Sequence, residues 1–575
     1  MQQKRTDLQA VLHNCRASFF SVGFFSLFIN ILMLVPALYM LQVYDRVIAS
    51  GSESTLLMLT LLMVFLMSTM GGLEWVRSRI MVRVSTRIDS LLGPRLYDAS
   101  FRQSLMTGGM QASAQPLNDL TGLRQFLTGN GLFAFFDSPW VPIYILIMFM
   151  FHPWFGWVAI VSVIILSTLA LINEKLTSKL LAEANGYHMS ATHFTTKNLR
   201  NAEVVESMGM LTRIRDRWQD KNRRVLALQS IASDRAGILT ALSKTIRLIV
   251  QSLVLGLGAY LAIQQEISPG LMIAGSILLG RALAPIDQMI GVWKQFTTAR
   301  SQYARLNEVL TQVGEAPERM SLPVPAGYLV AENLLVAAPG SRTPILKGIS
   351  FKVDPGTMVG VIGPSASGKS TLARAILGIW PSAGGKMRLD GADVYGWLRE
   401  ELGPHIGYLP QDIELFEGSI SENIARFGDI DSEAVVRAAR MAGVHEMILA
   451  LPDGYDTIIG ATGGGLSGGQ RQRVGLARAI YGSPKVVVLD EPNSNLDDQG
   501  EAALAVALKA LKETGATVFV ITHRASVLSV VDKLMVLKEG TLAMYGPRDQ
   551  VLAELQKTRT NNPPQATSAS PGGVA

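Results

Sequence analysis

A glycine-rich segment with the form G-x-x-x-x-G-K-S lies at Gly363–Ser370. The apolar run Met358–Gly363 leads into it and a helix-forming run follows, which is the strand–loop–helix context that such a loop requires. Backbone N–H groups of this loop can wrap phosphate oxygens, Lys369 can reach the β- and γ-phosphates, and the Ser370 hydroxyl can bind Mg²⁺. The predicted ATP-binding residues are Gly363, Pro364, Ser365, Ala366, Ser367, Gly368, Lys369, Ser370 and Thr371.

Two adjacent carboxylates, Asp490 and Glu491, end a later apolar run that begins at Val486. Asp490 is placed to hold Mg²⁺ through water, and Glu491 to polarise the attacking water as a general base. Gln411 follows one apolar run, where it can reach the metal and the attacking water. His523 ends another apolar run, where it can contact the γ-phosphate. A lone glutamine or histidine is usually an ordinary surface or core residue, but this order behind a phosphate loop favours catalysis. The predicted catalytic residues are Glu491, His523, Gln411 and Lys369, and the predicted Mg²⁺ ligands are Ser370, Gln411 and Asp490.

A second glycine-rich motif, Leu466-Ser467-Gly468-Gly469-Gln470, opens a basic helical run. Its N–H groups, the Ser467 hydroxyl and the positive end of the helix dipole can all bind phosphate. With this quintet, which completes the set of motifs, the chain resembles the ABC ATPase family. That resemblance implies two ATPase domains packed head to tail, with each ATP between one phosphate loop and the partner's Ser467, Gly468, Gly469 and Gln470. It therefore implies a homodimer with two sites, in which Ser494–Asp497 matches the segment that crosses the interface.

Two departures from the family pattern concern nucleotide binding and coupling. The stretch Leu335–Gly340 has no aromatic residue to stack on adenine. Ala461 stands where exporters of the family often carry a glutamate before the signature motif. The resemblance therefore leaves open what stacks on the base and which residues link the domains there.

The rest of the chain has the composition of a membrane protein. Of its 575 residues 48% are hydrophobic and 17% are charged, whereas soluble proteins carry about 25% charged residues. Residues 1–324 hold 29 Lys and Arg against 20 Asp and Glu, a net charge of +9, and residues 325–575 hold 23 against 26, a net charge of −3. The basic surplus flanks long apolar runs, which excludes a wholly soluble enzyme and argues against a nucleic-acid partner.

Six apolar stretches are long enough to cross a lipid bilayer. The long segments after the second and fourth stretches are basic, so they and both termini should face the cytoplasm, and the short connections should face the far side. The sequence therefore predicts a multi-pass membrane protein with its ATPase domain in the cytoplasm, and the family resemblance given below implies that this membrane is the inner membrane of a bacterium. The six predicted spans are Phe19–Leu41, Thr55–Leu73, Leu132–Phe151, Trp154–Ile172, Ile246–Ile263 and Gly270–Val292.

Four charged residues of this half are candidates for coupling or for the pathway. Asp119 and Glu206 lie in segments, Asp119–Phe126 and Asn201–Met210, that are expected to form short transverse helices touching another domain. Ordinary helix surface is the alternative for both. Asp137 and Arg281 lie in or near apolar spans, where an unpaired charge is costly; a pore role is one interpretation, and snorkelling or a structural ion pair is the other.

The predicted fold is an α-helical exporter domain of six spans fused to an α/β phosphate-loop ATPase domain. The expected divisions are a cytoplasmic N-terminal segment (1–18), the six-span domain with long cytoplasmic helix extensions (19–313), a linker (314–327), the ATPase domain (328–557) and a disordered tail (558–575).

Three stretches of the membrane half, Ala37–Arg46, Phe136–Tyr144 and Asn201–Gly209, resemble the type I secretion ATPases that export metalloproteases. This resemblance implies export of an unfolded protein with an uncleaved C-terminal signal, here an alkaline metalloprotease, driven by ATP and Mg²⁺. It also implies a periplasmic membrane-fusion protein and an outer-membrane channel as partners. About 18 residues precede the first span, too few for the peptidase-like domain of some relatives. An exporter of lipids or hydrophobic drugs is the alternative, because the fold alone does not select the cargo.

Overall fold

The computed structural model describes residues 7–108, 113–314, 319, 321–460, 465–494 and 496–561. The chain divides into two compact units: a membrane unit of residues 1–103 and 112–314, and an ATPase unit of residues 104–111 and 315–575. Ala461 and residues 562–575 of the predicted tail lie outside the described residues.

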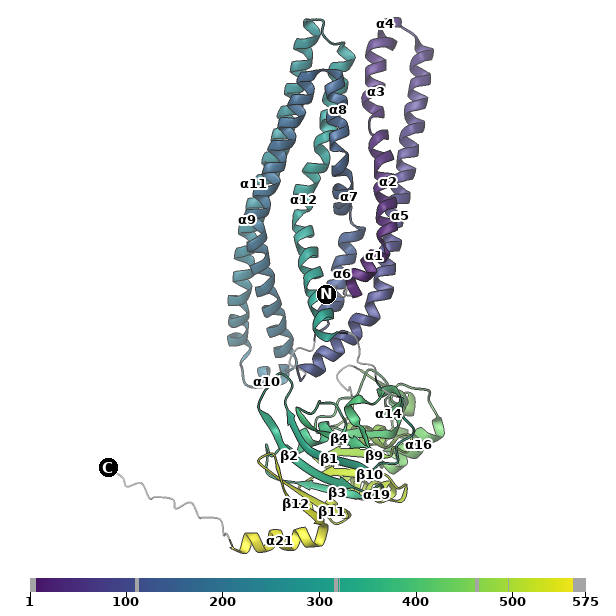
Figure 1. Cartoon of the computed structure of the whole chain (residues 1–575), viewed down its shortest axis with the longest axis vertical. Coiled ribbons are helices and arrows are strands. Elements are labelled where there is room, and N and C mark those ends of the chain that lie inside the picture. The colour runs from purple at the N-terminus through teal and green to yellow at the C-terminus, as the bar shows by residue number, and fades with distance from the viewer. Residues whose placement is uncertain are drawn as a thin grey trace, which may run out of the picture. The chain divides into compact units, whose positions relative to one another are not determined.

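The membrane unit is built from helices alone within its described residues (Figure 1). They are α1 (Asp7–Asn14), α2 (Arg16–Leu32), α3 (Val35–Gln42), the π-helix η1 (Val43–Val47), α4 (Ile48–Ser50), α5 (Glu53–Met106), α6 (Gln115–Thr128), α7 (Asn130–Asp137), the 3₁₀ turn η2 (Ser138–Trp140), α8 (Val141–Phe151), α9 (Pro153–Leu199), α10 (Ala202–Ser207), α11 (Leu211–Ile263) and α12 (Pro269–Val313).

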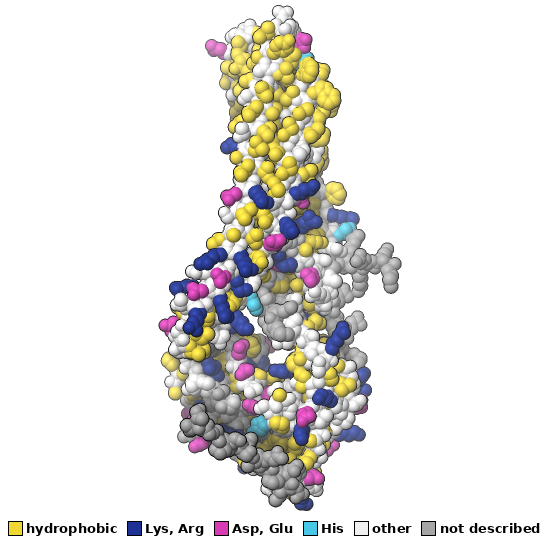
Figure 2. Space-filling model, turned by 90° about the vertical axis from the view of Figure 1, so that its left-hand side faces the viewer, with side chains coloured by type: hydrophobic (Ala, Val, Ile, Leu, Met, Phe, Trp, Pro, Cys, Tyr) yellow, Lys and Arg dark blue, Asp and Glu magenta, His cyan; other side chains and the backbone are white. Residues whose placement is uncertain are grey.

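Six stretches of helix in the described residues are long and apolar enough to cross a membrane, and each contains one predicted span. α5, α9, α11 and α12 have 54, 47, 53 and 45 residues, so α5 alone is about 80 Å long, against about 30 Å of hydrocarbon. The helices therefore continue well beyond a bilayer, as the sequence predicted. In Figure 2 apolar side chains cover one end of this unit and Lys and Arg side chains gather toward the other.

Two apolar clusters hold the membrane unit together. One joins α5, α6 and the second half of α12 around residues such as Met81, Leu123 and Leu306. The other joins α8, α9, α11 and the first half of α12 around Tyr144 and Phe155. α12 runs unbroken through Pro285 and contributes to both clusters. It is therefore the central helix of the unit.

The ATPase unit has mixed α/β structure. Its first elements are β1 (Leu329–Ala337), β2 (Pro344–Val353), β3 (Met358–Ile362), α13 (Lys369–Ile376), β4 (Gly384–Leu389), β5 (Ala392–Asp393), η3 (Val394–Gly396), α14 (Arg399–Leu402), η4 (Gly403–His405), β6 (Ile406–Leu409), β7 (Gly418–Ser419) and α15 (Ile420–Ile424). The others are α16 (Ser432–Met441), α17 (His445–Leu449), η5 (Gly454–Asp456), β8 (Ile458–Ile459), α18 (Gly468–Ile480), β9 (Val486–Asp490), α19 (Asp498–Glu513), β10 (Thr517–Ile521), α20 (Ala525–Leu528), β11 (Lys533–Lys538), β12 (Thr541–Pro547) and α21 (Arg548–Asn561).

A six-stranded sheet with the order β12-β11-β3-β10-β9-β6 is the frame of this unit. Its strands are parallel except for the antiparallel edge strand β12. Side chains alternate between the two faces of each strand, and in β9 Val486 and Val488 pack into one apolar cluster while Val487 and Leu489 pack into another. A separate sheet of order β2-β1-β4-β5 shares the first cluster.

Candidate ATP site and the charges of the membrane unit

Four neighbouring parallel strands, β3, β10, β9 and β6, carry the predicted site residues just beyond their carboxyl ends. Ile521, the last residue of β10, is in register with Val361 on one side and Asp490 on the other. Leu409, which ends β6, is in register with Leu489. The phosphate loop, the two carboxylates, His523 and Gln411 therefore share one edge of the sheet, where parallel sheets bind their ligands.

The phosphate loop has the backbone that close contact with phosphates requires. Gly363 and Gly368 have φ angles of 158° and 99°, and Ala366 has a φ of 62°. A Cβ on Gly363 would lie 2.3 Å from the carbonyl oxygen of Leu537, so only glycine fits there. Lys369 is 8% exposed, and its Nζ donates to the carbonyl oxygens of Gly363 and Pro364 at 2.8 and 3.0 Å. The ammonium group is thus held inside the loop.

Asp490 has the properties of a cation ligand. It is 3% exposed, and its Oδ1 has no hydrogen-bond partner among the described residues. Burial raises the pKa of Asp490, and the hydrogen bond with Ser370 opposes this rise. Glu491 raises the pKa further, and Lys369 lowers it. A buried carboxylate oxygen without a donor, beside a serine hydroxyl, fits Mg²⁺, which prefers oxygen ligands.

Glu491 is held in a strained backbone conformation beside Gln411. Its φ is 50°, in the left-handed region that non-glycine residues rarely adopt. Its backbone N–H donates to the carbonyl oxygen of Ile521 at 2.9 Å, and Gln411 Nε2 donates to its Oε2 at 3.3 Å. Strain of this kind collects at functional sites. The structure therefore places the Glu491 carboxylate beside the amide that should sense the γ-phosphate.

Sequence reasoning missed three residues that support this segment. Gln472, on α18 and 1% exposed, donates through Nε2 to the carbonyl oxygen of Glu491 at 3.3 Å. The Thr522 hydroxyl donates to Asn493 Oδ1 at 3.0 Å, and both side chains are buried. The signal for Gln472 was its place two residues after the signature quintet, but nothing in the sequence indicated its partner.

His523 reaches the same edge but makes no contact there. It is exposed, and its imidazole has no hydrogen-bond partner in the described part of the chain. The side chain is free to turn toward a γ-phosphate, and its catalytic role stays a prediction.

The signature motif forms the start of α18. Ser467 caps the helix: its Oγ accepts from the N–H of Gln470 at 3.2 Å, and Gln470 Oε1 accepts from the N–H of Ser467 at 2.8 Å. α18 packs into the cluster that contains Val487, whereas the phosphate-loop helix α13 packs into the one that contains Val488. The large sheet therefore separates the two helices whose N-termini are predicted to bind phosphate.

Asp137 is part of a buried polar network in the membrane unit. Its Oδ1 accepts from Arg77 Nη1 at 2.8 Å and from Asn30 Nδ2 at 3.1 Å. Arg77 Nη1 also donates to Ser26 Oγ at 2.9 Å, and the Tyr144 hydroxyl donates to the carbonyl oxygen of Asn30 at 2.8 Å. All five residues are at most 9% exposed. The contacts favour the structural ion pair over the pore role for Asp137.

Asp119 is also paired inside the membrane unit. It is 2% exposed, and both of its oxygens accept from Arg305 on α12 at 2.7 Å. The predicted short helix is α6, which packs along α12. This geometry does not support the coupling role predicted for the Asp119 carboxylate, because a buried and paired group cannot touch another domain.

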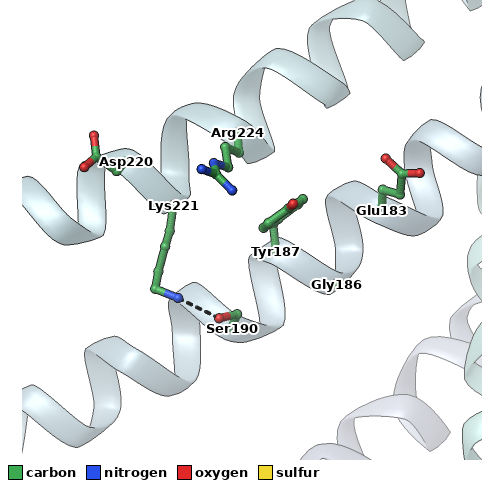
Figure 3. A pocket seen from close by; sticks show the side chains of 7 residues that line it. All are labelled: Glu183, Gly186, Tyr187, Ser190, Asp220, Lys221 and Arg224. Carbon is green, nitrogen blue, oxygen red and sulfur yellow. Dashed lines mark hydrogen bonds between the residues drawn. The ribbon is translucent and has the colours of Figure 1, made fainter.

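Glu206 and Arg281 are the two candidates that remain exposed. Glu206 lies on α10, which joins the ends of α9 and α11 (Figure 1). A groove of about 550 Å³ runs between those two helices, and Figure 3 shows its charged lining. Lys221 donates to Ser190 at 2.9 Å, and Arg224 lies 5.7 Å from the ring centre of Tyr187. These contacts tie α9 to α11 near α10.

The fold and the motifs define an ABC exporter. The ABC transporter family matches residues 346–494, and the ABC transporter transmembrane region matches residues 19–283. A bacterial Atm1-family ABC exporter with ATP bound has the same fold, with a TM-score of 0.82 and 22% identity over 97% of this chain and 99% of that chain. The chain binds ATP and couples its hydrolysis to transport, and it is a multi-pass membrane protein.

Similar proteins show to which family of ABC transporters the chain belongs. The chain is 45% identical to the type I secretion system ATP-binding protein PrsD of Rhizobium meliloti, over 96% of this chain and 95% of that protein. It is 28% identical to the leukotoxin translocation ATP-binding protein LktB of Mannheimia haemolytica, over 92% of this chain and 75% of that protein. The chain therefore belongs to the family of type I secretion system ABC transporters.

Proposed function

We propose that this chain is the inner-membrane ATPase of a type I secretion system and exports an unfolded protein with an uncleaved C-terminal signal. The observation that carries the proposal is the 45% identity to PrsD over nearly the whole of both chains. We propose an alkaline metalloprotease as the cargo, on the likeness of Ala37–Arg46, Phe136–Tyr144 and Asn201–Gly209 to exporters of such proteins. A periplasmic membrane-fusion protein and an outer-membrane channel complete the proposed path.

The working form is proposed to be a homodimer. Because the sheet separates α13 from α18, a second copy is the simplest source of Ser467 for a nucleotide held by Lys369. The exposed Ser467 N-cap supports this arrangement, since its hydroxyl and the following N–H groups are at the surface. Each ATP would then lie between the phosphate loop of one chain and Ser467, Gly468, Gly469 and Gln470 of the other.

ATP hydrolysis is proposed to take place at the carboxyl edge of the large sheet. Ser370, Asp490 and Gln411 would hold Mg²⁺, which neutralises charge on the β- and γ-phosphates. Glu491 would take a proton from the attacking water, and Gln411, already 3.3 Å from its Oε2, would orient that water. Lys369 would leave its two loop carbonyls for the phosphates, and His523 would turn to the γ-phosphate.

Coupling to the membrane is proposed to run through α10. This helix and its flanks expose apolar side chains, with Val204, Met208 and Leu211 between 51% and 70% exposed, beside Glu206. The Lys221–Ser190 contact and the Arg224–Tyr187 contact join the long helices α9 and α11. These two helices can therefore move together and transmit a movement of α10 to the membrane spans.

Reconstituted secretion tests this function. Cells that express a candidate metalloprotease, the two envelope partners and this chain should release the protease, and cells with Lys369→Ala in the chain should not. The matched test is ATP-dependent lipid movement in vesicles that contain the purified protein. Lipid movement together with secretion that does not depend on the chain would replace the proposal with a lipid exporter.

A further inference from the structure

The guanidinium group of Arg426 lies at the end of the signature helix α18 and has no carboxylate partner among the residues that the structure describes. Arg426 donates from Nε to the carbonyl oxygen of Arg478 at 3.0 Å and from Nη2 to those of Ala479 and Tyr481 at 3.0 and 3.1 Å. Arg478 and Ala479 lie in the last turn of α18 and Tyr481 directly follows the helix, so no helical N–H satisfies these carbonyls. Its Nη1 donates to the carbonyl oxygens of Gly403 and Ile406, both at 2.9 Å. Arg426 therefore ties the end of α18 to the start of β6.

The local structure is built for this contact. Arg426 has a φ of 59°, a left-handed conformation that costs a non-glycine residue free energy. Gly407 in β6 allows close approach of the strand to the helix end, because a Cβ there would lie 2.2 Å from the carbonyl oxygen of Ala479. Burial lowers the pKa of Arg426 to about 10, so the guanidinium group stays charged at neutral pH while it donates to main-chain carbonyl oxygens.

The two joined elements carry residues of different predicted roles. β6 leads into Gln411, which contacts Glu491, and α18 begins at Ser467. In the proposed head-to-tail dimer, Gln411 serves the ATP held by its own phosphate loop, and Ser467 serves the ATP held by the partner. We infer that Arg426 is a positioning residue that transmits the state of one ATP site, through β6 and α18, to the other. The inference rests on the dimer of the proposed function.

Arg399 offers a matched control within the same unit. It too has a pKa lowered to about 10 by burial, and it donates to the carbonyl oxygens of Leu377 at 2.7 Å and of Gly378, at the end of the phosphate-loop helix α13. Its third acceptor, the carbonyl oxygen of Val394, lies in the same apolar cluster as α13. Arg399 therefore has the same chemistry as Arg426 but does not join β6 to α18.

The test is the ATP dependence of hydrolysis by the purified full-length protein in lipid nanodiscs, without cargo. Arg426→Lys keeps the charge but cannot span five carbonyls, so kcat should fall about tenfold, the size of one or two net hydrogen bonds. The Hill coefficient for ATP should fall toward one with KM nearly unchanged. Arg399→Lys should instead raise KM and leave the Hill coefficient as in the wild type.

A second variant separates positioning from folding. Arg426→Gly relieves the left-handed strain while it removes the guanidinium, so it should fold and show the same loss of cooperativity. Wild-type cooperativity in both Arg426 variants, or an equal loss of cooperativity in Arg399→Lys, would overturn the inference. Because these assays need no cargo, their outcome can be interpreted even if the secretion test fails.

Discussion

The buried aspartates of the ATPase unit and of the membrane unit have different partners. At the edge of the large sheet, Asp490 Oδ1 is buried without a partner and His523 is exposed without one, within the described residues. In the membrane unit, Asp137 and Asp119 are buried and accept hydrogen bonds from arginines. A buried carboxylate oxygen without a donor at the ligand-binding edge of a parallel sheet fits a cation, whereas a carboxylate paired with arginine fits a structural role. The same residue type therefore has a different meaning in each unit.

The largest expected effect is at the unsatisfied edge. Glu491→Gln should lower ATP hydrolysis by about a hundred- to ten-thousandfold, because the amide cannot accept a proton from water. ATP binding should persist, since Lys369 and the loop are untouched. Single-turnover hydrolysis and retained radiolabelled ATP measure the two effects. Normal secretion by this variant would refute the role of Glu491.

The next effect tests the buried network around Asp137. Asp137→Ala leaves the Arg77 cation buried without its carboxylate, which should cost about 3–5 kcal/mol of folding free energy. Thermal unfolding of the purified protein and its yield in the membrane measure this loss. The double variant Arg77→Met with Asp137→Leu should recover most of it, because no charge is left unpaired. A stable Asp137→Ala protein that hydrolyses ATP and fails only in secretion would restore the pore role.

A smaller loss is expected from the Asp119–Arg305 pair. Arg305 is 39% exposed at its side chain, so water can solvate it when its partner is removed, and Asp119→Ala should cost about 1–3 kcal/mol. Thermal unfolding of the purified protein, with Asp119→Asn as the milder variant, checks this. Unchanged stability with uncoupled ATP hydrolysis would instead favour the predicted coupling role.

The ease of prediction also differed between the units. In the ATPase unit, each predicted site residue lies at or after the end of a strand, and adjacent parallel strands bring their carboxyl ends to one edge. Local sequence order was therefore enough to place Lys369, Asp490 and Gln411 together. In the membrane unit, the six spans followed from hydropathy, but the partner of Asp137 was 60 residues away on α5. Arg77 was counted with the basic cytoplasmic residues, because composition gives no information on which helices face each other. Arg426 was missed because its partners are main-chain carbonyls, which have no sequence signature.

Arg281 differs from Asp137 and Asp119 because its side chain is exposed although it lies in an apolar span. Arg281→Gln breaks no side-chain hydrogen bond or ion pair among the described residues, so the free energy of unfolding should change by no more than about 0.5 kcal/mol. If the side chain faces the path of the cargo, secretion should fall by at most about fivefold, the size of one exposed electrostatic contact. Arg281→Lys, which keeps the charge, should secrete as the wild type does. Secretion at the same level by Arg281→Gln and Arg281→Lys would show that the charge only contacts lipid headgroups. None of the four charged residues that the sequence singled out in the membrane unit would then remain a candidate for the pathway.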